Sequence, residues 1–109
     1  MLDMLEGATP YRIEDAERYE RLRWWPGLTL GDLLDKAADV FPEKEGFSDG
    51  ATTLTFQEAR DRTNRLALSM IQLGIAPKER VLVQVPNWNE FVLAYFAVQK
   101  IGAVAVLLI

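Results

Sequence analysis

The sequence has no cysteine and no histidine among its 109 residues. The absence of cysteine excludes disulfides, thiol nucleophiles and thiolate metal sites, and the absence of histidine removes the commonest zinc ligand and the usual base of a hydrolytic triad. The turn Pro86-Asn87-Trp88-Asn89, between a predicted strand and a predicted helix, contains no glycine, so it cannot form a glycine-rich phosphate loop. Structural zinc, triad hydrolysis and a dinucleotide or P-loop site are therefore excluded.

Positive charge is also scarce, because 12 Lys and Arg residues stand against 16 Asp and Glu residues and give a net charge of −4. Nonspecific nucleic-acid binding rests on Lys and Arg, so DNA and RNA are not expected partners. Residues 1–7 are acidic where a secretory signal has a basic start, which predicts no export signal and a cytoplasmic location. The apolar stretch 91–109 is interrupted by Gln99, Lys100 and Gly102, so no membrane span is predicted.

Apolar residues, by contrast, are plentiful. Half of the chain is hydrophobic and 10% is aromatic, which favours one folded domain with a modest core over a disordered chain. We expect a flexible leader over residues 1–12 and a folded part over residues 13–109.

Helical patterns and one turn signal occupy the first two thirds of the chain. The composition predicts helices over residues 13–23, over residues 30–41 with Thr29 as cap, and from a Thr55 to Glu58 capping box to Gly74. Asp49-Gly50 predicts a small hairpin between residues 46 and 56. The inward face predicted for the third helix is Ala59, Leu66, Ala67, Met70 and Leu73, with Arg60, Asp61, Arg62 and Arg65 facing water.

The last third is a strand, a helix and a second strand. Residues 80–85 and 103–109 are short β-branched runs that we expect to be buried on two faces, and a helix over residues 87–101 is predicted with Asn87 as its cap. Tight connections predict a βαβ crossover with parallel strands. The fold class is α/β, with N-terminal helices and a hairpin, and the apolar end at Ile109 predicts part of a larger, truncated sheet.

Three features admit a binding role beside a plain structural one. An anion at the helix start near Asn87 competes with simple capping. The acids Glu14, Asp15, Glu17 and Glu20 could hold a cation, but their helical spacing among arginines favours solvated ion pairs. Residues 18–25 could stack on nucleic acid or lie on a membrane, whereas the alternative is that Trp24 and Trp25 pack over the edge of the domain.

Several segments, in order, resemble the opening of the adenylate-forming superfamily of acyl-CoA synthetases, luciferases and nonribosomal adenylation domains. The segments that resemble it are Thr29-Leu30-Gly31-Asp32-Leu33-Leu34, Leu54-Thr55-Phe56-Gln57-Glu58-Ala59, Leu73-Gly74-Ile75 with Arg80-Val81, Val85-Pro86-Asn87-Trp88-Asn89-Glu90-Phe91 with Ala94, and Lys100-Ile101-Gly102-Ala103-Val104. Arg18-Tyr19, Trp24-Trp25 and Gly27-Leu28-Thr29-Leu30 are especially similar to the 2,3-dihydroxybenzoate-AMP ligases.

The resemblance implies that residues 13–109 are an incomplete N-terminal portion of the large domain of such a ligase. It implies an enzyme that uses ATP and Mg²⁺ to adenylate a carboxylic acid, favouring a 2,3-dihydroxybenzoate-like aryl acid, and passes it to the thiol of CoA or a carrier protein. No catalytic, cofactor-binding or metal residue of the family falls within this sequence, so we expect the 109 residues alone to be inactive and to bind no cofactor.

Two other functions stay open from the sequence. One is a fatty or alicyclic acyl-CoA synthetase, and the other is a noncatalytic interaction module that recruits a partner by strand addition. In each case the apolar helix and strand at the end of the chain predict self-association of the 109 residues.

Overall fold

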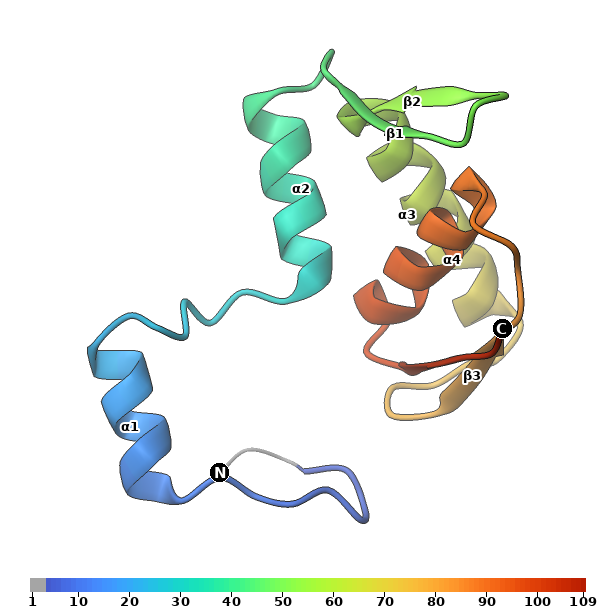
Figure 1. Ribbon diagram of the computed structural model, residues 1–109. Helices are drawn as coiled ribbons and strands as arrows, with labels where there is room; N and C mark the ends of the chain where they lie inside the picture. The colour runs from blue at the N-terminus through green and yellow to red at the C-terminus, as the bar shows by residue number, and fades with distance from the viewer. Residues whose placement is uncertain (1–3) are drawn as a thin grey trace.

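A computed structural model describes residues 4–109 as a helical and stranded body with a separate N-terminal segment (Figure 1). The elements in chain order are α1 (Ile13–Arg21), α2 (Leu30–Val40), β1 (Glu45–Ser48), β2 (Thr53–Thr55), α3 (Phe56–Gln72), β3 (Arg80–Val83), α4 (Asn89–Lys100) and β4 (Val104–Leu107). The predicted order of helices, hairpin and βαβ unit is confirmed. Within the described part of the chain, no helix has the length and apolar character needed to cross a bilayer.

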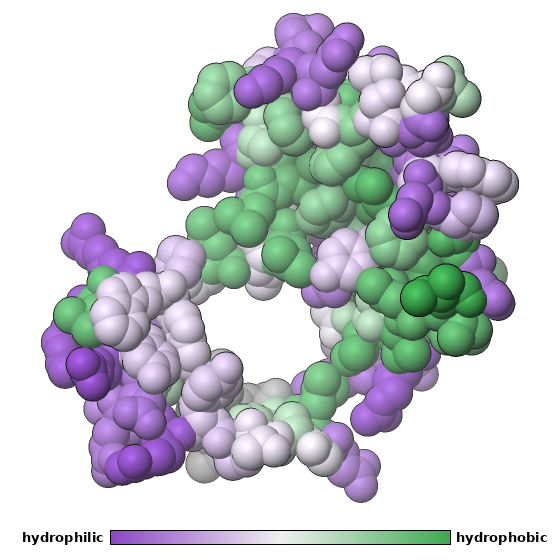
Figure 2. All heavy atoms as spheres, viewed as in Figure 1, coloured by the Kyte–Doolittle hydropathy of each residue, from purple (hydrophilic) through white to green (hydrophobic). Residues whose placement is uncertain are grey.

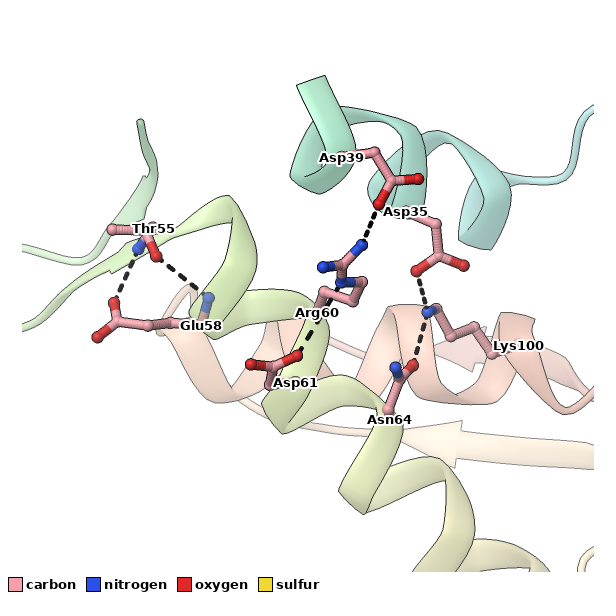
Figure 3. Close-up of polar contacts among 8 residues, drawn as sticks. All are labelled: Asp35, Asp39, Thr55, Glu58, Arg60, Asp61, Asn64 and Lys100. Carbon is pink, nitrogen blue, oxygen red and sulfur yellow. Dashed lines mark hydrogen bonds and ion pairs between the residues drawn. The ribbon is translucent and has the colours of Figure 1, made fainter. Parts of the chain in front are cut away.

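Both predicted threonine caps start their helices. The Thr29 hydroxyl accepts from the Asp32 N–H at 3.1 Å, and the Asp32 carboxylate accepts from the Thr29 N–H at 2.8 Å. Thr55 and Glu58 make the same reciprocal pair at 3.1 and 2.9 Å (Figure 3). Each box satisfies amides that the first helical turn leaves free, so α2 and α3 begin where the sequence specifies.

Glycines in the left-handed region end α3 and α4. Gly74 has φ of +93°, and its N–H donates to Ile71 O at 2.9 Å, while the N–H of Ile75 donates to Met70 O at 3.2 Å. Gly102 ends α4 by the same pattern. This is the Schellman arrangement, in which a residue without Cβ turns the chain off the helix at little cost.

β3 and β4 pair in parallel, with Arg80 opposite Val104 and Val83 opposite Leu107. Their parallel direction is as predicted. The prediction that both faces are buried does not hold within residues 4–109, because Val83 on one face is 5% exposed, whereas Leu82 and Val106 on the opposite face are 61% and 40% exposed. Only one face of the pair lies against α4, and the other has no covering layer within residues 4–109.

Helix α4 lies between two parts of the core. On one side it meets the hairpin, α2 and α3; on the other it covers the β3–β4 pair (Figure 1). The buried residues on the first side are Leu34, Leu54 and Ala59, and those on the second are Val83, Val98 and Ala103. The apolar circumference of α4 follows from this sandwiched position. Leu73, which was predicted to face inward, is 82% exposed because α3 ends before it.

Residues 11–28, which we call the arm, stand apart from the body. α1 has no buried residue, and Figure 2 shows an open gap between the arm and the body in that view. Tyr19 stacks on Trp24 with ring centroids 5.5 Å apart and meets Trp25 edge-on at 5.1 Å. The two tryptophans therefore pack on the arm's own helix, and the expectation that they pack over the edge of the domain is wrong within the described residues.

Candidate functional site

The loop after β3 leads into α4 at the carboxyl ends of the parallel strands, which is the edge where open α/β sheets bind ligands. α4 begins at Asn89, with Trp88 at the N-cap position and no capping bond from its side chain. Asn87 was predicted as the cap, so that prediction is wrong by one residue. Pro86, Asn87 and Trp88 are exposed, and Asn89 is 5% exposed.

A carboxylate from the hairpin takes the place of a local cap. Asp49 Oδ2 accepts from the Asn89 N–H at 3.1 Å, and Asn89 Nδ2 donates to Thr52 O at 2.7 Å. The other oxygen, Oδ1, accepts from the N–H groups of Ala51 and Thr52 inside the turn. Amide donation from Thr52, Asn89 and Ala51 lowers the pKa of Asp49 below its ordinary value of 3.8.

This contact decides between the two predictions for the start of α4. A helix N-terminus favours negative charge, and here the chain's own Asp49 provides it. A nucleotide phosphate at this point would meet that carboxylate at close range. The residues present therefore do not fit a phosphate, and the backbone and side-chain amides of Asn89 hold the hairpin against α4.

Next to this loop, an open hollow of about 690 Å³ lies at the end of the β3–β4 pair. Its lining residues are Gln84, Val85, Pro86, Asn87, Phe91, Leu107, Leu108 and Ile109. None of these side chains is acidic, basic or nucleophilic. The hollow is an apolar surface without a group for proton transfer, metal binding or covalent catalysis.

A polar cluster forms a clamp between three helices (Figure 3). Lys100 Nζ at the end of α4 donates to Asp35 Oδ1 of α2 and to Asn64 Oδ1 of α3, each at 2.6 Å. The Lys100 side chain is 13% exposed, and it crosses Gly31 so closely that a Cβ there would lie 2.8 Å from Lys100 Cγ. Lys100 is bonded to both Asp35 and Asn64, so the clamp ties α4 to α2 and α3.

A second ion pair joins α2 to α3 beside that clamp. Arg60 Nη1 donates to Asp39 Oδ1 at 2.5 Å, and Arg60 also lies 4.0 Å from Asp61 (Figure 3). The Arg60 side chain is 24% exposed. Arg60 was predicted to face water, but it is half-buried because it reaches across to α2.

The acid cluster of α1 does not form a metal site within residues 4–109, where no group of three acidic side chains is close enough to hold an ion. Arg12 Nη2 pairs with Glu14 at 2.9 Å and Arg12 Nε lies 3.9 Å from Asp15. Ion pairing is confirmed for these two acids, although through Arg12 and not the later arginines. Arg18 lies over Trp24 at 6.0 Å from the ring centroid, so the arginine and tryptophan of the supposed stacking platform engage each other.

The model of one family matches residues 34–109, and it is described as "AMP-binding enzyme". The chain is 39% identical over 103 residues to the 2,3-dihydroxybenzoate-AMP ligase of Bacillus subtilis, which covers 94% of this chain and 19% of the relative. It is 34% identical to the salicyl-AMP ligase / salicyl-S-ArCP synthetase of Mycobacterium tuberculosis, over 94% of this chain and 19% of the relative.

Among solved structures, the apo structure of MbtA from Mycobacterium smegmatis superposes with a TM-score of 0.88 at 35% identity, over 93% of this chain and 20% of that one. Such coverage includes most of the arm together with the body. The chain spans about a fifth of the length of these relatives.

Proposed function

Because the chain belongs to the AMP-binding enzyme family, we propose that it is the N-terminal part of an ATP-dependent aryl-acid ligase. The observation that carries the proposal is the match to aryl-acid AMP ligases over 94% of the chain, arm included. The likeness at 35% identity to a solved chain, extending through arm and body alike, supports it. A fatty or alicyclic acyl-CoA synthetase and a noncatalytic module are not favoured.

The proposed reaction has two steps. A carboxylate oxygen of the acid attacks the α-phosphorus of ATP, the bond to the β-phosphate oxygen breaks, and pyrophosphate leaves. The sulfur of a CoA or carrier-protein thiol then attacks the acyl carbonyl, AMP leaves, and the thiol proton is released to a base or solvent. Mg²⁺ would supply charge neutralisation for the phosphates, and no residue of these 109 is proposed to hold it. We place this chemistry in the cytoplasm, where ATP and thiols coexist.

The substrate proposed is a benzoate-type acid with a hydroxyl on the ring carbon next to the carboxyl-bearing carbon. The relatives' names include 2,3-dihydroxybenzoate and salicylate, which share that feature. The apolar hollow beside Phe91 is compatible with a packing surface inside a larger protein, but it has no group that would recognise the hydroxyl or the carboxylate.

Within this enzyme, residues 13–109 are proposed to be scaffold, and residues 1–12 a leader, of which residues 1–3 lie outside the described part. Asp49, Asn89 and Lys100 make structural contacts, and the start of α4 does not fit a phosphate. The groups that bind ATP and the acid are therefore proposed to lie in the four fifths of the relatives' length that this chain does not span.

Exchange of pyrophosphate into ATP tests the proposal. A polypeptide from the same gene that includes the sequence after residue 109 should catalyse exchange that depends on salicylate or 2,3-dihydroxybenzoate, and octanoate should support little. The 109 residues alone should catalyse none. Carboxylate-dependent exchange by the 109 residues would contradict the scaffold role, and a preference for octanoate would contradict the substrate class.

We also propose that the 109 residues associate with one another when no further chain is present. Leu82 and Val106 are exposed on the uncovered face of β3 and β4, and burial of such side chains favours association. Sedimentation velocity over a concentration series should show oligomers that Val106→Lys abolishes. A monomeric wild-type chain at the highest concentration would refute this.

A further inference from the structure

The arm carries an assembled aromatic cluster that the body does not cover. Tyr19 lies at its centre, with Trp24 and Trp25 on it, and Tyr11 meets Trp25 edge-on at 4.8 Å. Tyr11 is 68% and Trp24 62% exposed. Preassembled aromatic side chains of this kind anchor interfaces, because they bury a large area and lose little side-chain freedom on docking.

The arm helix cannot depend on itself for stability. α1 has nine residues and no buried side chain, and isolated helices shorter than about 12 residues are marginal in water. Among residues 4–109 it has no extensive contact with any other helix or strand. A surface outside these residues must therefore hold it if it is to keep one position.

The comparison with MbtA indicates where that surface lies. A TM-score of 0.88 over 93% of this chain requires arm and body to superpose together, so the arm has the same position in a chain five times as long. The contacts that fix it there cannot come from the equivalents of residues 29–109, because the body described here does not touch the arm extensively.

We infer that the aromatic cluster of the arm docks on the same polypeptide beyond Ile109, as an intramolecular strap. The inference rests on the proposed function only in requiring a longer chain. Gly27, whose φ of +73° turns the chain shortly before α2, lies in the arm near its junction with the body, and α1 stands apart from the other helices and from β3 (Figure 1). The strap therefore contacts a part of the longer chain that these 109 residues do not provide.

Amide hydrogen exchange measures the docking without reference to activity. In the longer polypeptide the amides of α1 should exchange at least about tenfold more slowly than in the 109-residue chain, where the helix frays freely. Trp24→Ser in the longer polypeptide should restore the fast exchange of α1 and leave α3 unchanged. Glu17→Ser, a change on the same helix outside the cluster, is the matched control and should keep the slow exchange.

Three results would overturn the inference. The first is that the α1 amides exchange at the same rate in the 109-residue chain and in the longer polypeptide. The second is that the α1 amides of the 109-residue chain become protected as its concentration rises, which would mean that the arm docks on a second copy. The third is a reading frame that stops at Ile109. Pyrophosphate exchange on the same samples separates the two proposals. A protected arm in an inactive protein supports the docking and contradicts the proposed ligase function. An active enzyme whose arm exchanges freely supports the ligase function and contradicts the docking.

Discussion

The arm and the body contain similar local features, such as helices and turns, but only the body has buried residues that hold these features together. In the body, α2 and α3 begin at capping boxes, α3 and α4 end at glycines, and Lys100 and Arg60 tie the helices together beside a buried core. The arm has a helix, a turn and stacked aromatic rings, but no buried residue. The difference shows that local signals are sufficient to shape a segment, whereas long-range burial is needed to fix its position.

The largest expected effect tests whether the body alone determines stability. Leu54, 1% exposed, is among the largest fully buried side chains, so Leu54→Ala should lower the free energy of unfolding by about 3 kcal/mol through lost burial and a cavity. Leu22→Ala in the arm, where the residue is 45% exposed, should change it by less than about 0.5 kcal/mol. Urea denaturation followed by circular dichroism measures both. Similar losses for the two variants would mean that the arm is part of the cooperative unit.

The sequence specified the body's local features well because they depend on neighbours a few residues apart. Thr29, Thr55 and Gly74 act as predicted, and the parallel pairing of β3 and β4 follows from a short apolar run on each side of a helix. The family could also be predicted from the sequence, because its motifs lie in order along the chain.

What the sequence could not supply were contacts between distant residues. Asp49 was read correctly as a turn residue, but its second role as the acceptor for Asn89 depends on how the hairpin lies over α4, 40 residues away. The N-cap of α4 is accordingly Trp88 and not Asn87, and the cap bond comes from Asp49 and not from a side chain of the loop. The prediction that Arg60 faces water was wrong for the same reason, because the position of Arg60 along α3 does not reveal its ion pair with Asp39 on α2.

A smaller loss in the free energy of unfolding is expected when the Lys100 clamp is removed. Lys100→Met keeps most of the packing over Gly31 but removes the bonds to Asp35 and Asn64, and should cost about 1 kcal/mol. Arg12→Met, which breaks the exposed pair with Glu14 in the arm, should cost close to nothing because exposed pairs contribute little. Paired urea curves decide the matter, and an equal cost for the two substitutions would show that the clamp is only another surface pair.

The contact between hairpin and α4 should make the body sensitive to acid. The pKa of Asp49 is lowered in the folded chain by amide donation, so its contribution is fully present above the ordinary pKa and is lost as pH falls through the folded value. Asp49→Asn should therefore be less stable than wild type above about pH 5, and the gap should narrow below about pH 4. Urea denaturation from pH 7 to pH 3 measures it. A gap that stays constant with pH would show that the charge of Asp49 does not matter.

The smallest effect concerns the one helix end at which the arm departs from the body. α1 ends in the same Schellman arrangement as α3 and α4: the Arg23 N–H donates to Glu20 O at 3.0 Å, and the Trp24 N–H donates to Tyr19 O at 2.9 Å. The left-handed position, however, holds Arg23 with φ of +58° where the body has Gly74 and Gly102.

Arg23→Gly should relieve that strain and stabilise α1 by up to about 1 kcal/mol, whereas Gly74→Ala should destabilise the body by a similar amount. Because the arm is not held by the body, the gain should appear as slower hydrogen exchange in α1 with no change in the urea midpoint. A shift of the midpoint by Arg23→Gly would mean that the arm and the body unfold together.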